Sequence, residues 1–441
     1  MTLRPQQPKT PYSAYSFREV PPEDAELTHV GPGTPCGEWM RRFWNPVAYS
    51  HEITDLPFKV RILGEDLVLF RDGTGRLGLL QAHCCHRGTS LEFGIVAERG
   101  LRCCYHGWLF DVDGTILEMP GEPAQAAAGK AAIYQGAYPV HEHQGVVFAY
   151  LGPPEKKPSF PMYDWWGWEG DSVVPGTRHY FPCNWLQVKE NAMDPAHLSF
   201  LHTISSGRQF SPAFGKLPEV EYIETPNGMA YVTSRRIGDN VWVRMTEFLY
   251  PNIHQVPTLL EDGTVPHPPG FPRTSIWSVP VDDVNTVVLP ILHVRAGDPA
   301  PVGLPFGQDA SRSYEERQRQ PGDYDAQIGQ RPIARHALEN LRTTDVGVVM
   351  LRRLIRSQIQ AVQNGQDPKG VWWDDRGFEP TCANDTVIYA PAAPTADEDR
   401  ELMRSLGRKV ADEIRRDPTR HFHSRWTNSD KYETAAALTR P

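Results

Sequence analysis

The sequence lacks the long apolar stretch that a membrane-spanning helix requires. No run of apolar residues approaches the about 18 that such a helix needs, and the opening stretch MTLRPQQPKTPYSAYSFREV has no apolar core of the signal-peptide kind. The chain also lacks an excess of positive charge, since 45 Lys and Arg stand against 54 Asp and Glu, for a net charge of -9. We therefore expect no membrane and no nucleic acid among its partners, because neither attracts a mildly acidic surface.

Cysteine is scarce and unevenly placed, which argues against a secreted disulfide framework. Of the seven cysteines, four stand in two adjacent pairs, at 84–85 and 103–104. An odd number of cysteines clustered with histidine is typical of metal chemistry in a reducing compartment. A cytoplasmic location is therefore expected.

Internal repeats are also absent, and turn residues divide the chain into three parts. A chain of 441 residues exceeds the size at which one hydrophobic core stops growing, so two domains are expected. Residues 1–35, rich in Pro and polar side chains, are expected to form an extended N-terminal arm. Residues 36–158 show short strand-like runs broken by turns such as DGTG, which predict a small antiparallel β domain. The Pro-rich stretch at 153–161 predicts a linker, since Pro disfavours both helix and central strand.

The second half, residues 159–441, is expected to have mixed α+β structure. Strand-like runs such as VWVRMTEFLYP at 241–251 alternate with helical segments. The segment 184–202 has helical character, although its Pro195 would distort a continuous helix. Residues 296–335, rich in Gly, Pro and charge, are expected to form a surface insertion. The clearest amphipathic helix covers 346–364, with one apolar face made of Leu351, Leu354, Ile355, Ile359 and Val362.

Two short clusters each offer one cysteine and one histidine at fixed spacing. Cys84-x-His86 is followed, after sixteen intervening residues, by Cys103-x-x-His106. One Cys and one His on each of two loops match a Rieske [2Fe–2S] centre, in which two thiolates hold one iron and two imidazoles hold the other. Such a centre passes electrons one at a time. The alternative is a Cys2His2 zinc site, which the pairing of unlike ligands on each loop disfavours.

Three further residues of these clusters fall outside the pattern. Neighbouring side chains in an extended loop point apart, so both members of a cysteine pair are not expected to reach one cluster. We therefore expect Cys85 and Cys104 to be buried free thiols rather than a disulfide. His83 is expected to be a polar residue at a strand end.

A one-electron centre needs a group to reduce, and a segment further along the chain supplies candidates. The pattern is Glu190-Asn191-x-x-Asp194-x-x-His197-x4-His202. On a helix Glu190, Asp194 and His197 would share one face, whereas His202 would point about 140° away from His197. Two histidines and one carboxylate form the facial triad of non-haem Fe(II) oxygenases. The alternative is a surface helix with two unrelated histidines.

With these motifs in this order, the chain resembles the α subunit of Rieske non-haem iron aromatic-ring-hydroxylating oxygenases, in the phthalate dioxygenase-like group. The match covers the C-x-H and C-x-x-H loops, the HRG and HGW around them, and NW…EN…D-x-x-H-x4-H. The family has a helix-grip catalytic domain, in which an antiparallel sheet curves around a long C-terminal helix. The resemblance implies this fold after an all-β Rieske domain. Cys85 departs from the pattern, because these oxygenases more often have Pro at that place.

The resemblance implies a mononuclear iron held by His197, His202 and a carboxylate. Asp345 is the expected carboxylate because it directly precedes the clearest helix, with Glu339 in reserve. The alternative role for Asp345 is a plain helix N-cap. Asp194 resembles the family's bridging aspartate, which joins a cluster histidine of one subunit to an iron histidine of the next. The working unit would then be a homotrimer or a multiple of it.

The resemblance also implies a terminal oxygenase that takes electrons from a separate NAD(P)H-dependent reductase, with or without a ferredoxin, and uses O2 at the mononuclear Fe(II). The implied reaction is hydroxylation or dihydroxylation of an aromatic compound, an aromatic acid being one candidate. Oxidative O- or N-demethylation by the same metals is one alternative. A non-catalytic Rieske electron-transfer protein is the other.

Substrate residues are less marked in the sequence. Asn191 is expected near the iron by its place in the motif, and Arg244 is a candidate to hold a substrate carboxylate. A solvated strand face is the alternative role for any single arginine. The other arginines near the expected pocket are Arg208, Arg235 and Arg236. The tryptophans expected in the core or at an interface are Trp165, Trp166, Trp168 and Trp242.

Overall fold

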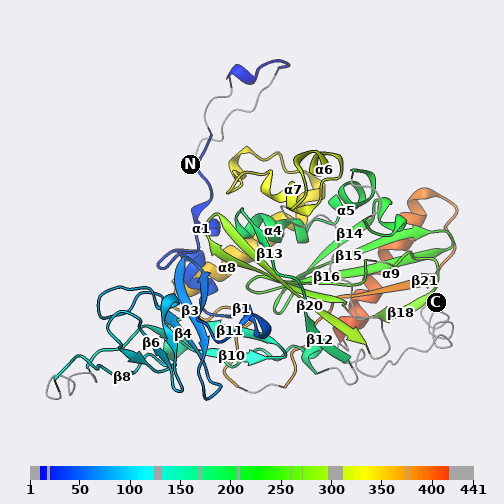
Figure 1. Cartoon of the computed structure of the whole chain (residues 1–441). Coiled ribbons are helices and arrows are strands. Elements are labelled where there is room, and N and C mark those ends of the chain that lie inside the picture. The colour runs from blue at the N-terminus through cyan, green and yellow to red at the C-terminus, as the bar shows by residue number, and fades with distance from the viewer. Residues whose placement is uncertain are drawn as a thin grey trace.

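The structure is a computed structural model of the whole chain. It describes residues 10–16, 20–123, 132–167, 171–205, 209–259, 261–270, 272–295, 311–374 and 377–416. Figure 1 shows a small set of strands from the first part of the chain beside one large sheet with its helices. Among the described residues, none of the helices combines the length and hydrophobicity that a transmembrane span needs.

The first part of the chain is built from short antiparallel strands. They are β1 (Trp44–Tyr49), β2 (Phe58–Ile62), β3 (Glu65–Arg71), β4 (Leu77–Gln81), β5 (Ile95–Val96), β6 (Leu101–Arg102), β7 (Leu109–Phe110), β8 (Ile116–Glu118), β9 (Ala137–Tyr138), β10 (Val140–His143) and β11 (Val146–Tyr150). Within the described residues they form the sheets β1-β11-β10, β2-β3-β4-β9 and β5-β6-β7-β8. Leu63 and Gly64, at φ 49° and 79°, close the tight turn between β2 and β3.

The second part holds one large antiparallel sheet. Its strands are β12 (Asp171–Pro175), β13 (His179–Phe181), β14 (Glu219–Thr225), β15 (Gly228–Ile237), β16 (Asn240–Leu249), β17 (Ile253–Val256), β18 (His267–Gly270), β19 (Thr274–Asp282), β20 (Asn285–Arg295) and β21 (Asn384–Tyr389). The order is β12-β20-β19-β17-β16-β15-β14, with β13 paired to β20, and β21 paired to both β16 and β18. The predicted run at 241–251 corresponds to β16.

Helices cover both faces of this sheet. The α-helices are α1 (Ala25–Thr28), α2 (Pro35–Met40), α4 (Trp185–Ala192), α5 (His197–Phe200), α6 (Tyr314–Arg319), α7 (Asp323–Ile328), α8 (Val346–Gln363) and α9 (Ala396–Arg416). Shorter helical turns are η1 (Ala14–Ser16), η2 (Ser50–Glu52), η3 (Leu91–Phe93), η5 (Pro154–Lys156), η6 (Asp164–Trp166), η7 (Leu201–Ser205), η8 (Pro212–Gly215), η9 (His336–Leu338) and η10 (Thr343–Asp345). The apolar face predicted for 346–364 is buried along α8.

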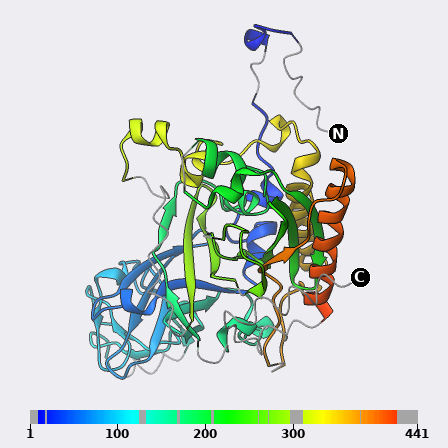
Figure 2. The same ribbon diagram turned by 90° about the vertical axis from the view of Figure 1, so that its right-hand side faces the viewer.

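Alternation along the strands gives the sheet two different faces. On one face Val232, Val243 and Met245 pack against Val410 of α9, the orange-red helix that runs beside the sheet in Figure 2. On the other face lie Tyr231 and its neighbours, which meet the side of the molecule that carries α4 and α8. The expected α+β architecture, a β domain followed by an antiparallel sheet with a long C-terminal helix, is confirmed.

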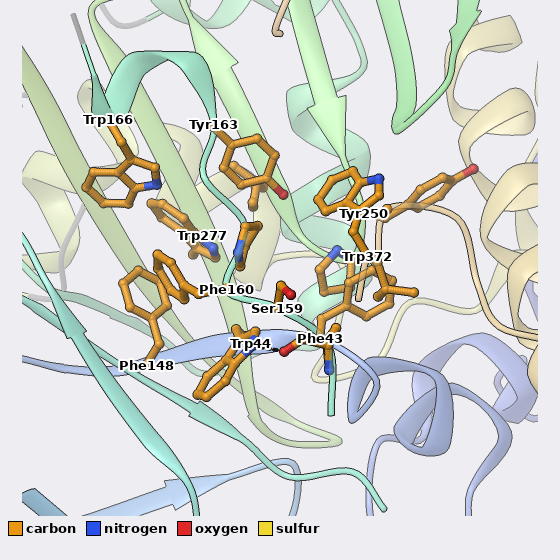
Figure 3. Close-up of a pocket in the computed structure, with 16 residues that line it drawn as sticks. Phe43, Trp44, Phe148, Ser159, Phe160, Tyr163, Trp166, Tyr250, Trp277 and Trp372 are labelled. Carbon is orange, nitrogen blue, oxygen red and sulfur yellow. Dashed lines mark hydrogen bonds between the residues drawn. The ribbon is translucent and has the colours of Figure 1, made fainter. Parts of the chain in front are cut away.

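An aromatic cluster joins the two parts of the chain (Figure 3). This cluster, called the aromatic joint below, includes Phe43, Trp44, Phe148, Phe160, Tyr163, Trp166, Tyr250, Trp277 and Trp372. Phe148 of β11 meets Phe160 at a ring distance of 5.0 Å and Trp277 of β19 at 5.8 Å, both edge to face. Trp44 donates from Nε1 to the main-chain oxygen of Pro158 at 3.1 Å. The stretch 153–161, expected to be a linker, is therefore packed between the two parts.

Part of the expected N-terminal arm is also packed against the body of the molecule. Leu27 and Val30 are fully buried. The main-chain oxygen of Thr28 accepts from Nδ2 of Asn184 at 2.8 Å, which ties this segment to the start of α4. Of the expected surface insertion, residues 296–310 lie outside the described residues, and the remainder carries α6 and α7.

Replacing Phe148 tests the importance of the aromatic joint. Because Phe148 is 2% exposed and touches both parts of the chain, Phe148→Ala is expected to lower the free energy of unfolding by about 3–5 kcal/mol. Guanidinium unfolding followed by tryptophan fluorescence measures the change. The control is Leu56→Ala, at a side chain 67% exposed, which is expected to change it by no more than about 0.5 kcal/mol. Equal midpoints for the two variants would contradict this role.

Candidate metal centres

Two loops of matching geometry, 84–88 and 103–107, carry the cluster motifs. In each loop the glycine amide donates to the carbonyl of the cysteine four residues earlier, at 2.8 and 3.1 Å. Gly88 and Gly107 have φ of 80° and 75°, a conformation that residues with a Cβ rarely adopt. The sequence C-x-H-x-G in one loop and C-x-x-H-G in the other thus produces two turns of the same size.

The four expected cluster ligands lie together at these turns. Cys84 and Cys103 are 3% and 2% exposed, and the rings of His86 and His106 are 4.6 Å apart. Nδ1 of His86 is buried and has no hydrogen-bond partner in the described part of the chain, while its ring stacks on Trp108 at 4.5 Å. Burial raises the pKa of Cys84 to about 11, and the neighbouring Cys103 adds to the rise. Two buried thiols beside two imidazoles, one with an unpaired nitrogen, fit a [2Fe–2S] cluster with mixed ligands.

The residues outside the motif turn away from this group. Cys85 and Cys104 are exposed free thiols, which corrects the expectation that they would be buried. Because Cys84 and Cys103 point inward, the residue after each points outward. His83 is also exposed, and its Nδ1 lies 3.0 Å from the main-chain oxygen of Gly88.

The backbone between α4 and η7 changes its helical form twice, and this places the two later histidines. α4 ends at Ala192 and α5 begins at His197, because Pro195 between them cannot continue a helix. α5 then runs directly into η7, which is a π-helix. Hydrogen bonds of a π-helix join residues five apart. His197 and His202 therefore come together, with ring centroids 5.3 Å apart.

Asp323, the first residue of α7, faces both histidines. Its Oδ1 is 3.5 Å from Nε2 of His197 and 3.2 Å from Nε2 of His202. Asn191 donates from Nδ2 to the same Oδ1 at 3.1 Å. The Nε2 of His202 is buried and makes no hydrogen bond of normal geometry. Two imidazole nitrogens and one carboxylate oxygen thus converge where they could hold one metal ion, and this donor set fits Fe(II) in a facial triad.

The other nitrogen of each ring is held by a carbonyl oxygen. Nδ1 of His197 lies against the main-chain oxygen of Asp194, and Nδ1 of His202 is 2.7 Å from Oε1 of Gln209. Since these oxygens accept, each Nδ1 donates, and each Nε2 keeps its lone pair for a metal. Sequence reasoning missed Gln209, because nothing in its spacing marks it.

At this site the attraction between the carboxylate and the imidazoles outweighs the effect of burial on the pKa values of Asp323 and His202. Burial alone would raise the pKa of Asp323, but His202, His197 and Asn191 bring it well below its ordinary value. Burial alone would lower the pKa of His202, but Asp323 and Gln209 raise it above its ordinary value. Asp323 is therefore an anion at neutral pH, the form that a metal ligand requires.

Asp345, the carboxylate expected from the sequence, is not part of this group. Its Oδ2 accepts from the backbone N–H of Arg342 at 2.6 Å, beside the start of α8. Asp345 stands at the N-cap position of α8, but its side chain makes no capping hydrogen bond there and bonds the backbone of the preceding turn, η10, instead. The structure brings Asp323 to the histidines instead. No motif marks Asp323, which lies within the stretch 296–335 that was expected to be a surface insertion.

The two glutamates named from the sequence belong to a separate ion-pair network. Glu339 accepts from Nη2 of Arg352 at 2.8 Å, and Glu190 accepts from Nε of the same arginine. His336 lies 3.9 Å from Glu190. Glu190, His336 and Glu339 could converge on a cation, but Arg352 already pairs with both carboxylates.

Asp194 lies at the surface beside the histidine pair. Its side chain is 30% exposed, and Oδ2 is 4.0 Å from Nδ1 of His197. Oδ1 accepts from the backbone N–H of Ala196 at 2.9 Å. Gly347 of α8 packs against this turn so closely that an added Cβ would lie 2.6 Å from the main-chain oxygen of Met193. The start of α8 therefore fixes the position of Asp194.

A cavity opens in front of the histidine pair and Asp323. It encloses about 990 Å³ of empty space, part of it continuous with solvent. Apolar side chains dominate its wall, among them Phe181, Leu198, Phe210, Tyr231, Leu259 and Ile276. Besides the three metal-site residues, the polar side chains in the wall include Asn191, Arg244, His254 and Gln327. Such a wall suits a small organic molecule that is oriented by a few polar contacts.

The arginines named from the sequence differ in their positions. Arg244 lines the cavity, donates from Nη2 to the main-chain oxygen of Pro257 at 3.2 Å, and has a buried Nε without a partner. Arg235 is buried behind the wall and donates to the main-chain oxygen of Lys216 at 2.9 Å. Arg236 pairs with an aspartate of α9.

Two residues named from the sequence, Arg208 and Trp168, lie outside the described residues. The other named tryptophans, Trp165, Trp166 and Trp242, are buried.

Comparison with known proteins decides the family. Residues 43–135 match the family model of the Rieske [2Fe-2S] domain. Over 436 residues the chain is 40% identical to the tert-butanol monooxygenase / tert-amyl alcohol desaturase oxygenase subunit of Aquincola tertiaricarbonis, with 91% of each chain covered. The chain belongs to the Rieske non-haem iron oxygenases.

Two further comparisons agree. The chain is 42% identical to the phenoxybenzoate dioxygenase subunit alpha of Ectopseudomonas oleovorans, over 82% of this chain and 91% of that one. The terminal oxygenase of carbazole 1,9a-dioxygenase from Nocardioides aromaticivorans IC177 has the same fold, with a TM-score of 0.55, 19% identity, and coverage of 77% of this chain and 100% of that one.

Membership of this family confirms the expected class of activity. The Rieske oxygenase described here is an oxidoreductase that incorporates O2, and it is the oxygenase component of a system that needs a partner reductase. Its cofactors are a Rieske [2Fe–2S] cluster and a mononuclear iron, as expected from the two clusters of ligands. Neither a zinc scaffold nor a plain electron carrier fits this result.

Paired substitutions test which carboxylate serves the mononuclear iron. Asp323→Asn is expected to weaken iron binding at that site by more than about tenfold, because the amide that replaces the carboxylate is a weaker ligand without charge. Asp345→Asn is the matched control and is expected to keep the iron. Bound iron is measured after anaerobic desalting, and the visible spectrum of the cluster reports that the Rieske domain remains intact. Loss of iron in Asp345→Asn with retention in Asp323→Asn would reverse the assignment.

Proposed function

We propose that this Rieske oxygenase hydroxylates or dihydroxylates a small, largely apolar aromatic compound, an aromatic acid being the favoured class. The observation that carries the proposal is the convergence of His197, His202 and Asp323 at the wall of an apolar cavity. When bound there, iron would supply the activation of O2, with electrons that reach it through the cluster. The cluster itself would be held by Cys84, His86, Cys103 and His106.

The wall of the cavity supports an aromatic substrate. Phe210 stacks on His202 with ring centroids 4.1 Å apart and 27° between the planes. Phe181 and Tyr231 also contribute rings to the wall. Flat rings favour offset or edge-on packing with other rings. A substrate ring held among these side chains would lie close to the iron ligands.

Arg244 supports an acidic group on that substrate. Burial lowers the pKa of Arg244, and the nearby Asp385 opposes this effect. A guanidinium still keeps its charge at neutral pH because its ordinary pKa lies far above that range. Its buried Nε has no partner in the described residues, so a carboxylate in the cavity would supply the missing acceptor. Asn191 would act differently, by holding Asp323 in place through their hydrogen bond.

The exposure of Asp194 supports electron transfer between subunits. Its carboxylate stands at the surface next to His197, where it can reach a cluster histidine, His86 or His106, of a neighbouring copy. A carboxylate between two imidazoles would orient both rings. The working unit would then be a homotrimer or a multiple of it. Electrons would come from NAD(P)H through a separate reductase, with a ferredoxin where required, in the cytoplasm.

Metal analysis is the first test. Protein purified without oxygen is expected to contain about three irons for every two acid-labile sulfides, from one cluster and one mononuclear site. Reconstituted protein that holds two irons for two sulfides would be an electron carrier, which would end the proposal.

Turnover decides the substrate. The oxygenase, a promiscuous reductase and labelled O2 are incubated with aromatic acids, methoxyaromatics, N-alkyl compounds and tertiary alcohols. Mass spectrometry is expected to find the label in a hydroxylated aromatic acid, with less product from Arg244→Gln. Label in a demethylated product or an alcohol alone would assign a different substrate class to the same iron.

Asp194→Asn tests the electron path. This variant is expected to keep both metals, because Asp194 is a ligand of neither. Transfer from the reduced cluster to the mononuclear iron should slow by about 10–100-fold in single turnovers. The control is Asp397→Asn on α9, whose side chain is 87% exposed and remote from both sites. A rate in Asp194→Asn equal to that of the control would refute the bridging role.

A further inference from the structure

A histidine of the cavity wall contacts a buried lysine, and the proposed function uses neither residue. Lys189 of α4 is fully buried, and its Nζ is 2.6 Å from Nδ1 of His254 on β17. The same Nζ donates to the main-chain oxygen of Ile276 on β19 at 3.3 Å. Within the described part of the chain, Lys189 has no carboxylate partner. The polar contacts of Lys189 are therefore with the ring of His254 and the backbone of β19.

When Lys189 is the donor in this contact, the contact determines which nitrogen of His254 carries the proton. Burial lowers the pKa of Lys189. Its ammonium form has three hydrogens and no lone pair, so in that form it can only donate, to Nδ1 of His254 and to the oxygen of Ile276. Burial, reinforced by Lys189, also lowers the pKa of His254 well below its ordinary value. A neutral ring that accepts at Nδ1 carries its proton on Nε2.

The strand directs His254 into the cavity. Alternate residues of a strand face opposite sides, and His254 and Val256 line the cavity that holds Asn191 and Asp323. Ile253 lines the aromatic joint on the opposite side of β17, where Figure 3 shows Tyr250 and Trp277. The packed joint therefore supports the strand from behind. The Nε2 of His254 has no hydrogen-bond partner among the described residues.

We propose that His254 is a specificity-determining residue, which donates from Nε2 to an oxygen atom of the substrate, and that Lys189 is the positioning residue that holds it in this tautomer. The proposal rests on the proposed function, because it concerns the same cavity. It assigns the substrate class as an apolar body that carries an oxygen acceptor, either a hydroxyl or a carboxylate. A molecule without such an oxygen would leave a donor unpaired in an apolar wall, and sites of this kind discriminate strongly against that loss.

The test compares probes that differ only in the oxygen group. One pair is tert-amyl alcohol and 2,2-dimethylbutane, in which a methyl replaces the hydroxyl. The other pair is phenoxybenzoate and phenoxytoluene, in which a methyl replaces the carboxylate. Dissociation constants are measured for the iron-loaded full chain without reductase, so that binding is separated from turnover. The pair that shows a preference for the oxygenated member identifies the oxygen group.

His254→Leu is expected to weaken binding of the preferred oxygenated probe by about tenfold and to leave its apolar counterpart within about twofold. Lys189→Met should produce the same selective loss. The matched control is Val188→Ala, which removes apolar surface from the same wall and should weaken both members of a pair alike. Equal losses across the pair in His254→Leu, or no preference for either oxygenated probe in the unaltered chain, would overturn the proposal.

Nitrogen-15 NMR of the histidine-labelled chain tests the role of Lys189 without any substrate. His254 is expected to show a protonated Nε2 and an unprotonated Nδ1, and Lys189→Met should populate both tautomers. A protonated Nδ1 in the unaltered chain would overturn the positioning role. Iron and sulfide contents near three to two in every variant show that the oxygenase itself is intact, so failure of this proposal remains distinct from failure of the proposed function.

Discussion

The contact of the Asp323 carboxylate with two imidazoles is the interaction on which the rest of this structure depends. A carboxylate cannot remain beside an apolar cavity without compensating charge and hydrogen bonds. Here His197 and His202 lie 3.5 and 3.2 Å away. Their positions follow from two interruptions of one helical segment, first by Pro195 and then by the π-helical turn of η7. A regular helix through this segment would direct the two rings apart and leave Asp323 without a pair of partners.

The large sheet holds the metal site and its cavity rigidly, because one face of the sheet is packed against a helix while the other face lines the cavity. One face of β15 and β16 packs against α9, and the opposite face supplies Tyr231 and Arg244 to the cavity. β17 divides the cavity from the aromatic joint that ties the β domain to the sheet. The cavity wall is thus backed by the aromatic side chains of this joint. Residues on such a wall keep their direction, which specificity requires.

Three polar side chains of the cavity wall are each held by a neighbour. Asn191 is held by Asp323, Arg244 by the main chain at Pro257, and His254 by Lys189. Each of the three also comes from a different element of the fold. Each such donor matters for binding, because an unpaired buried donor costs its full desolvation energy. Under the proposed roles, substrate choice would depend on which oxygen atoms can satisfy these groups.

Local patterns in the sequence were sufficient for the features that a short segment fixes alone. The Cys and His spacing at 84–86 and 103–106 predicted the Rieske loops, because two turns of five residues place their own ligands. The alternation at 241–251 and the apolar face at 346–364 predicted β16 and α8 for the same reason. The prediction that Cys85 and Cys104 are buried was wrong. In each tight loop the ligands occupy the buried positions, so the other side chains point to solvent.

Only the tertiary structure decided which carboxylate meets the histidines and what the cavity presents to a substrate. Asp345 had the better sequence context, at the start of a clear helix, yet its carboxylate bonds the backbone of the preceding turn, η10. Asp323 had no motif, yet the path of α7 across the end of the sheet brings it to His197 and His202. Lys189 and His254 likewise stand on a helix and a strand 65 residues apart. The sequence by itself determined the chemistry of each local motif, whereas contacts between distant segments depend on the packing of the whole sheet and its helices, which no local spacing encodes.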